Sequence, residues 1–397
     1  MTALESTDQQ LAGEPPKQRD GFVQVRVAGA PYEMGLQHGE LLKQEIHGLL
    51  DAVYHHVLYG QPGALGWGIR ALVRGTTNLM ATQIPPRYRR EMAGIARAAD
   101  VSYRDVLLVN CFDDVLANLR LLEGLAARLA CSGFALEPER TTSRELLCGR
   151  NLDYFVTSAH GDDVWAATNY MKEHVAVIEH QPDGAASFAS VGWPGFVGTA
   201  TAMSDRGMVV SSLTVTTIRN RPIATPAPFL YRRIMEDTNT LEDAIRVLQH
   251  APRTQGNNVL LGSGDEGKAA VVEFTPWRFA VRRPEGGWIA TTNHFNHPSM
   301  LHHGGQVFGS STDRLARLGE LCDCQEPIPS EIGGAASFLI DAERPSAEAN
   351  EYCSVWNPCT IYSTYFAPAK RRMWVRISDR PGRSFEDVRL AGWSAGD

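Results

Sequence analysis

The sequence lacks the features that mark membrane-bound, secreted and nucleic-acid-binding proteins. No apolar stretch approaches the ~18 residues of a membrane span. The first 20 residues are polar and partly acidic, without the basic and then apolar order of a signal peptide. The formal net charge is −7, with no run of like charges, which argues against a nucleic-acid surface. We expect a cytoplasmic protein that binds neither nucleic acid nor membrane, with a disordered leader over residues 1–20.

Patterns typical of disulfide frameworks and metal sites are also scarce. Seven cysteines in 397 residues, with no secretion signal, do not predict a disulfide framework. Several histidines crowd residues 294–303, but they lack the spacing of a zinc site. Residues 262–267 fit G-x-G-x-x-G, yet the segment after them predicts a strand, where a dinucleotide motif needs a helix. The sequence therefore predicts no metal and no organic cofactor.

The chain changes character near residue 131. Alternating apolar residues predict a strand over 21–29, and apolar spacing near 3.6 predicts helices in most of the segment up to residue 130. From residue 131 onward, short β-type runs separated by turn residues dominate. The expected helices cover residues 30–58, 67–82, 86–99, 103–126, 227–249 and 311–325. We predict a layered α+β architecture, divided into a helical segment at 21–130 and a catalytic region at 131–397.

Two strand-like runs joined by a polar turn bring Cys131 near Arg150 and Asp153. A cysteine at a chain terminus carries its own base, since an α-amino group has a pKa of about 7.7–8.0 and a thiol about 8.5. A guanidinium would stabilise the thiolate, and a carboxylate would orient the α-ammonium group. Residues 150 and 153 face opposite sides of a regular strand, so a bulge or strand end is expected near Asn151.

At these residues the chain resembles a known group of enzymes. Cys-x-Gly-x-Ala-Leu from Cys131, followed by Gly-Arg-Asn-Leu-Asp-Tyr, is similar to the N-terminal-nucleophile (Ntn) cysteine hydrolases of the choloylglycine hydrolase and penicillin V acylase type. The isopenicillin-N acyltransferase-like branch also carries Gly-x5-Gly-x2-His-Gly, which is matched by residues 29–39. The segments at 292–295, 311–314 and 359–368 resemble the same branch. The resemblance extends from about residue 21 over nearly the whole chain.

The resemblance implies a four-layer αββα sandwich preceded by a helical pro-segment. It implies autocatalytic cleavage between Ala130 and Cys131, with Cys131 as the nucleophile. The residues implied around Cys131 are Arg150, Asp153, Asn293 and Arg314. Asn293 offers N–H donors for an oxyanion. Related enzymes often carry Asn where this chain has Thr214, so the Thr214 hydroxyl is the candidate second donor.

We therefore expect a self-processing cysteine enzyme that hydrolyses or transfers the acyl group of an N-acyl amide or acyl thioester. The resemblance allows an acyl-CoA donor, although no phosphate-binding motif supports one. Trp193 and Phe196 lie in an apolar loop suited to lining an acyl or aryl pocket, or to plain packing. The pro-segment is expected to stay tightly associated, and self-association into a homo-oligomer stays open.

Two alternatives remain at this point. One is an uncleaved thiol hydrolase with a Cys–His pair, in which His294 is the base. The other is a non-catalytic member of the fold that only binds a ligand. A buried cysteine is often a small hydrophobic residue, and Arg150 with Asp153 would also suit a structural ion pair. The acyl chain, the acceptor and the completeness of cleavage are not encoded in any motif.

Overall fold

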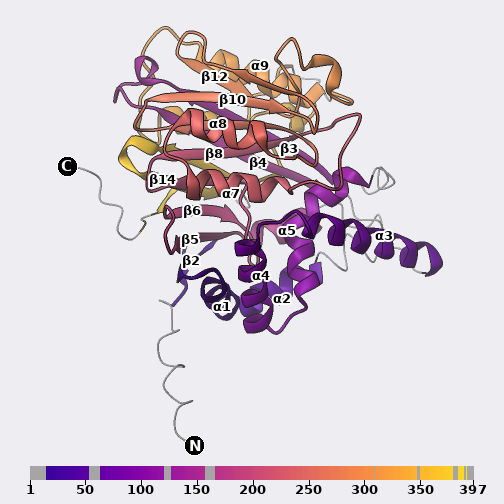
Figure 1. The fold of residues 1–397 in the computed structure, drawn as a ribbon. Coiled ribbons are helices and arrows are strands. Elements are labelled where there is room, and N and C mark those ends of the chain that lie inside the picture. Colours follow the sequence, from indigo (N-terminus) through magenta and orange to yellow (C-terminus); the bar gives the residue numbers. More distant parts are fainter. Residues whose placement is uncertain are drawn as a thin grey trace, which may run out of the picture.

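The computed structural model describes residues 15–52, 63–119, 127–156, 166–307, 309–346, 349–378, 383–388 and residue 390. Two stacked β-sheets form the centre of the molecule, and helices cover both outer faces (Figure 1). The larger sheet has nine described strands in the order β1-β2-β5-β6-β7-β8-β9-β10-β11. The smaller has six, in the order β12-β3-β4-β13-β14-β15. Of the paired strands described, β2 and β5 run parallel and the other pairs antiparallel.

The strands are short and follow the alternation of apolar side chains. The larger sheet contains β1 (Lys17–Gln18), β2 (Val23–Gly29), β5 (Ala176–Pro182), β6 (Phe188–Gly192), β7 (Thr201–Ser204), β8 (Met208–Val215), β9 (Gly256–Ser263), β10 (Lys268–Phe274) and β11 (Phe279–Arg282). The smaller sheet contains β3 (Ala127–Leu136), β4 (Leu147–Val156), β12 (Trp288–Thr291), β13 (Thr360–Ala367), β14 (Arg372–Ile377) and β15 (Glu386–Val388).

The helices divide between an N-terminal group and the outer layers. The N-terminal group is α1 (Pro31–Leu41), α2 (Lys43–Ala52), α3 (Gly63–Ala81), α4 (Pro86–Ala99) and α5 (Tyr103–Asn118). The others are α6 (Ala166–Glu173), α7 (Ala227–Asp237), α8 (Leu241–His250) and α9 (Gly309–Cys322). Among the described helices, none is both long and apolar enough to cross a bilayer.

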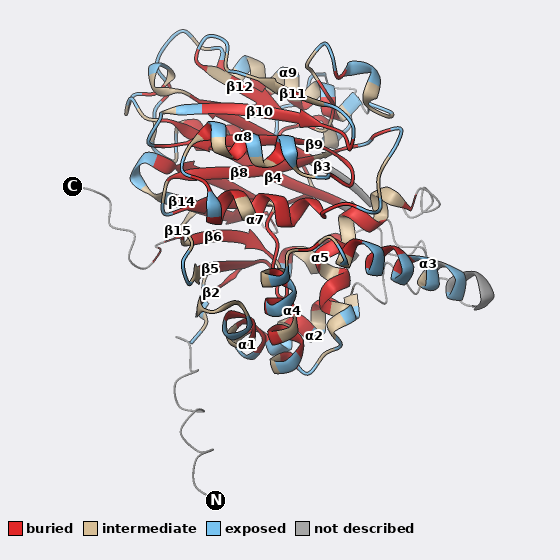
Figure 2. Ribbon diagram, viewed as in Figure 1, coloured by how far each residue is buried: buried red, intermediate tan, exposed pale blue. Residues whose placement is uncertain are grey.

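Three apolar clusters define the layers. Along β3, Cys131 and Ala135 point into the space between the sheets, whereas Phe134 and Leu136 point toward α9. This period of two is the one expected of a strand buried on both faces. On the far side of the larger sheet, α7 and α8 pack over the outward residues of β8, β9 and β10. Both sheets are buried throughout most of their length (Figure 2). The predicted αββα sandwich is confirmed.

The N-terminal helices pack against the edge of the larger sheet formed by β2 and β5. Helices α1 and α4 cross closely because glycines replace side chains at the contact. A Cβ on Gly35 would lie 2.0 Å from the Glu91 carbonyl oxygen, and one on Gly94 would lie 2.3 Å from that of Tyr32. Within the pattern over residues 29–39, Gly35 and Gly39 therefore serve helix packing, whereas Gly29 takes a positive φ of 105° before α1.

Several predicted boundaries differ from the structure. Helix α4 matches the prediction, but the helix expected over 30–58 is interrupted at Leu42, and its last residues lie outside the described part. The helix expected over 227–249 is two helices, because Thr240 caps α8 by accepting a hydrogen bond from the Asp243 N–H. Strand β3 begins at residue 127, four residues before the predicted boundary. Lys17–Gln18 pair with β2, so the leader is not wholly disordered.

Candidate active site

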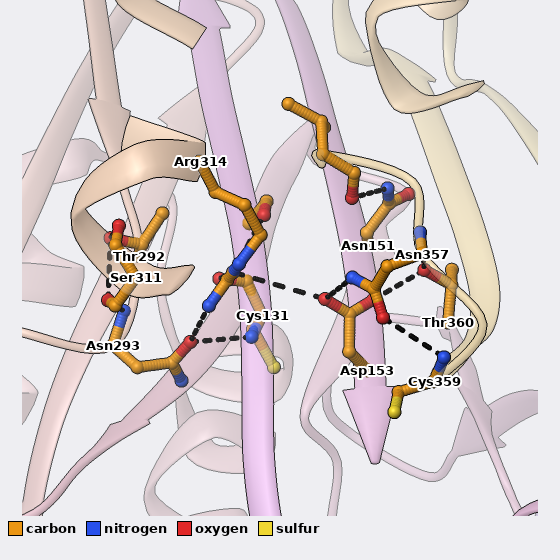
Figure 3. Close-up of polar contacts among 12 residues, drawn as sticks. Cys131, Asn151, Asp153, Thr292, Asn293, Ser311, Arg314, Asn357, Cys359 and Thr360 are labelled. Atoms are coloured by element: carbon orange, nitrogen blue, oxygen red, sulfur yellow. Dashed lines mark hydrogen bonds and ion pairs between the residues drawn. The ribbon is translucent and has the colours of Figure 1, made fainter. Parts of the chain in front are cut away.

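Cys131 lies in the middle of β3, with its thiol buried between the two sheets (Figure 3). The pairing of β3 with β4 places Arg150 opposite Gly133, and the Arg150 side chain turns back toward the cysteine. Its Nη2 lies 3.6 Å from Cys131 Sγ and donates to the Ser212 carbonyl oxygen at 2.7 Å. Its Nη1 donates to Tyr362 Oη at 2.9 Å. The guanidinium is thus fixed beside the thiol.

The Cys131 thiol and the Arg150 guanidinium differ in their charge states. Burial raises the pKa of the Cys131 thiol, and the charges of Arg150 and Arg314 only partly oppose it. Burial acts to lower the pKa of Arg150, but Tyr362 and the thiol outweigh it, and the net pKa is raised. In the intact chain the thiol is therefore protonated and the guanidinium is charged. The charged guanidinium would stabilise a thiolate at this position, but forming the thiolate requires a base.

Asn293 and Arg314 hold the main chain at Cys131 (Figure 3). The Cys131 N–H donates to Asn293 Oδ1 at 2.6 Å, and Arg314 Nη2 donates to the same oxygen at 3.2 Å. Arg314 Nη1 donates to the Cys131 carbonyl oxygen, and to Ser132 Oγ at 2.9 Å. Asn293 Nδ2 donates to the Thr214 carbonyl oxygen at 2.9 Å. The side-chain amide of Asn293 is therefore oriented by hydrogen bonds at both its oxygen and its nitrogen.

Asp153 lies on the other face of β4 from Arg150. Its carboxylate accepts from Thr360 Oγ1 at 2.7 Å and from Asn357 Nδ2 at 3.0 Å, and lies 3.9 Å from Arg314 Nη1. The β3–β4 pairing is unbroken, and the strand irregularity lies on β13, between Thr360 and Tyr362. Asp153 therefore reaches the cysteine through Arg314, which spans from the carboxylate to the Cys131 carbonyl.

A cavity of about 110 Å³ opens beside the Cys131 thiol. Its walls are mostly apolar and aromatic, and Trp193, Phe196 and Thr214 all line it. Trp193 is fixed by its Nε1–H, which donates to the Met171 carbonyl oxygen at 3.0 Å. The N-terminal helices α2 and α5 supply a further part of the wall, including Phe112. The pocket is thus built jointly by the segment before Cys131 and the segment after it.

The loop that carries Trp193 and Phe196 is tied to the N-terminal helices. His38 Nε2 accepts the Gly195 N–H at 2.9 Å, and burial lowers the pKa of His38 to about 3, so the ring is neutral. Asn110 Nδ2 donates to the Gly195 carbonyl oxygen at 2.8 Å. Asn110 Oδ1 accepts from the N–H groups of Val197 and Gly198 at 2.6 and 3.0 Å. The histidine of the Gly-x2-His-Gly pattern therefore positions a wall of the cavity.

His294 is placed differently from a catalytic base. Its Nδ1 lies 2.8 Å from Ser311 Oγ, and its Nε2 lies 3.1 Å from Asn296 Nδ2. Nδ1 thus contacts helix α9 and Nε2 contacts the loop of His294 itself, so both ring nitrogens are engaged, and burial lowers the pKa of the ring. Within the described part of the chain, no group of three or more His, Cys, Asp or Glu side chains is arranged to hold a metal ion.

Sequence reasoning missed several residues of this site. Thr201, Tyr362, Asn357 and Thr360 fix Arg150 and Asp153. Polar residues at alternate positions of a buried strand were the available signal for Thr360 and Tyr362. Thr201 carries no local signal, because its contact with Arg150 spans 51 residues of sequence.

Comparisons with known proteins identify the family that the chain matches. Residues 141–381 match the family described as acyl-coenzyme A:6-aminopenicillanic acid acyl-transferase, a region that includes Arg150, Asp153, Asn293 and Arg314 and begins after Cys131. An uncharacterized protein of Archaeoglobus fulgidus is 29% identical over 281 residues, covering 66% of this chain and 45% of that protein. This chain thus spans less than half of that relative.

The acyl-coenzyme A:6-aminopenicillanic-acid-acyltransferase 40 kDa form of Emericella nidulans is 22% identical over 303 residues, covering 76% of each chain. Among solved structures, the Caenorhabditis elegans N-acylethanolamine-hydrolyzing acid amidase ortholog aligns with a TM-score of 0.43 and 15% identity, over 60% of this chain and 93% of that one. A mutant of conjugated bile acid hydrolase from Clostridium perfringens aligns with a TM-score of 0.42 and 14% identity, over 66% and 92%. Because the family match covers more than half of its residues, this chain belongs to the acyl-coenzyme A:6-aminopenicillanic acid acyl-transferase family.

Proposed function

We propose that this protein cleaves its own chain between Ala130 and Cys131 and then uses Cys131 to hydrolyse or transfer an acyl group. One observation carries the proposal. Cys131 is contacted at its thiol by Arg150, at 3.6 Å, and at its main-chain nitrogen by Asn293 Oδ1, at 2.6 Å. A core cysteine needs no guanidinium at its thiol, and its N–H would normally pair with a main-chain carbonyl. A nucleophile that becomes a chain terminus needs both of the contacts seen here.

Processing would proceed as an intramolecular acyl shift. The Cys131 thiol adds to the Ala130 carbonyl carbon, the Ala130–Cys131 C–N bond breaks, and the thiol proton passes to the Cys131 nitrogen. That step frees the α-amino group, and water then hydrolyses the thioester, which leaves a carboxylate on Ala130 and restores the Cys131 thiol. Asn293 Oδ1 accepts an N–H from this nitrogen as an amide, and can do so again once it is an amine.

Turnover would use the same groups. The α-amino group takes the thiol proton, and Arg150 stabilises the thiolate that attacks the carbonyl of an amide or thioester. Asn293 Nδ2 has a second N–H beyond the one given to Thr214, and this hydrogen suits the oxyanion; losing one such donor typically costs ~2.7–4 kcal/mol. The leaving amine or thiol takes the proton back. Water or an amine then attacks the acyl-enzyme.

Denaturing mass spectrometry of the purified protein tests the proposal. We expect two chains, residues 1–130 and 131–397, and a single chain of 397 residues for Cys131→Ala. Cys148→Ala is the matched control, because Cys148 is also buried between the sheets, on β4. A phenylacetyl thioester should add one acyl mass to residues 131–397 only.

Two outcomes would contradict parts of the proposal. An uncleaved chain that still forms an acyl-enzyme at Cys131 would exclude the α-amino base. An uncleaved chain whose Cys131 stays unmodified would favour a protein of this fold that only binds a ligand.

A further inference from the structure

Two adjacent acidic residues of α5 line the cavity beside Cys131, and the proposed reaction gives them no task. They are Asp113 and Asp114. Helix α5 lies against α4 and near α7 (Figure 1), so these acids reach the cavity from the N-terminal helices while the thiol reaches it from β3. Burial raises the pKa of Asp113 to about 6 and that of Asp114 to about 7. Perturbed acids in a cavity mark functional sites more often than chance.

The hydrogen bonds of the two acids are incomplete. Asp114 Oδ1 accepts from Thr254 Oγ1, and from the Ala227 N–H at 3.2 Å. Asp114 is fully buried, yet no described residue donates to its Oδ2. The Oδ1 atom of Asp113 has only a long contact, 3.4 Å, with Tyr154 Oη. A structural carboxylate in the interior normally has its oxygens satisfied, so an acceptor is left for a ligand.

The polar side chains of Tyr231, Gln255 and Asn257, which line the same cavity, each have a buried atom without a hydrogen-bond partner among the described residues. Gln255 and Asn257 are each less than 4% exposed. No residue in the described part of the chain forms a hydrogen bond with Gln255 Oε1 or with Asn257 Nδ2. An ammonium group brings three N–H donors and no acceptor. Asp114 Oδ2, Gln255 Oε1 and the Asp113 carboxylate are acceptors that match them.

The charged residues of the cavity also favour an ammonium ligand. Among the described residues that line the cavity, the charged ones are Asp113, Asp114 and Arg150. Arg150 is already bonded to Ser212, Tyr362 and Thr201. With both carboxylates ionised, the cavity carries a net charge of −1, which one cation would neutralise. The aromatic walls around it also favour a cationic group carried on an apolar body.

We propose that the cavity binds the protonated amino group of the substrate at Asp113 and Asp114, so that Cys131 acts on acyl compounds whose apolar body carries an amine. This inference rests on the proposed function, because it names the substrate class of the same site. It makes Asp113 and Asp114 specificity-determining residues, supplied by the segment before the cleavage point. Neutral acyl compounds of the same shape would bind more weakly, because they leave the carboxylates unpaired.

Equilibrium binding of two probes to the full-length protein tests this without any acyl transfer. We would titrate 2-phenylethylammonium and its neutral counterpart 2-phenylethanol by calorimetry at pH 7.5. The cationic probe should bind at least tenfold more tightly. Asp114→Asn keeps the acceptor for Thr254 and Ala227, and Asp113→Asn changes a residue with only a long contact. Each should reduce the preference at least fivefold, and the double variant should bring it near one.

Asp183→Asn is the matched control, since it removes the same charge from an exposed turn and should leave the preference unchanged. Equal affinities for the two probes in the wild-type protein, or binding of neither, would overturn the inference. So would a preference that survives in Asp113→Asn and Asp114→Asn. Acylation of Cys131 by a neutral thioester would still stand in those cases, so the proposed function is tested separately.

Discussion

Replacing Asn110 by alanine should loosen the wall of the cavity, because Asn110 lines the cavity and also holds the 195–198 loop. Asn110 is buried on α5, and its side chain holds three main-chain groups of the 195–198 loop. Alanine would leave the Gly195 carbonyl and the N–H groups of Val197 and Gly198 without these partners. An unsatisfied buried polar group costs ~1–3 kcal/mol, and partial relaxation puts the total at about 3–5 kcal/mol of unfolding free energy.

The assay is urea unfolding followed by Trp fluorescence and circular dichroism. Asn118→Ala is the matched control, because Asn118 lies on the same helix and donates only within it, to the Asp114 carbonyl oxygen at 2.8 Å. That variant should lose less than about 1 kcal/mol. Because the loop carries Trp193 and Phe196, Asn110→Ala should also raise KM more than it lowers kcat.

Equal and small losses of unfolding free energy in Asn110→Ala and Asn118→Ala would refute this reasoning. Such a result would mean that water replaces the amide at no cost and that the loop is held by its own packing. If Asn110→Ala is destabilised but its KM is unchanged, the hydrogen bonds of Asn110 stabilise the fold, but the loop does not shape the substrate site.

Three other changes test separate parts of the structure. Arg232→Met removes the ion-pair partner of the buried Glu91 and Glu236 and should lower the free energy of unfolding in urea by ~3–5 kcal/mol. Arg246→Met, which removes an exposed ion pair with Asp243, should lower it by only ~0–1 kcal/mol. Arg150→Gln should raise the pH at which iodoacetamide alkylates Cys131, because the positive charge of Arg150 lowers the pKa of that thiol and glutamine carries no charge. Asp114 has a pKa of about 7 in the folded protein against ~3.9 in the unfolded chain, so its contribution makes the free energy of unfolding fall as the pH rises from ~4 to ~7. Urea unfolding at several pH values should show that Asp114→Asn removes up to ~4 kcal/mol of this decrease.

The sequence allowed the parts of the site that depend on neighbouring strands to be predicted. Cys131 and Arg150 lie on two ten-residue strands joined by a short connection, so their approach follows from local pairing. Alternation along β3 likewise predicts which residues face the second sheet. Helix α4 was predicted to its ends because Pro86 marks its start and apolar spacing runs through it.

The parts that the residues alone could not predict depend on contacts between segments far apart in sequence. His38 meets Gly195 across 157 residues, and Asn293 meets Cys131 across 162. For Asn293 only the resemblance to a family supplied the position. Asp113 and Asp114 carried a local signal, two acids in succession within an otherwise apolar helix, but that pattern is also typical of a solvated helix face. Only the packing of α5 against the cavity distinguishes the two interpretations.

In the proposed mechanism, an intact chain would be inert toward substrate because its Cys131 thiol has no base. The thiol pKa is raised by burial, and the residue that could take its proton in the proposed mechanism is its own nitrogen, which is still an amide. Arg150 and Asn293 already contact the thiol and the nitrogen of Cys131 in the intact chain, so in the proposed mechanism cleavage would need to change only one group. Breaking the Ala130–Cys131 bond converts a neutral amide into an amine with a pKa of ~7.7–8.0, well matched to a thiol. The site would thus be assembled by folding and activated by the loss of a single bond.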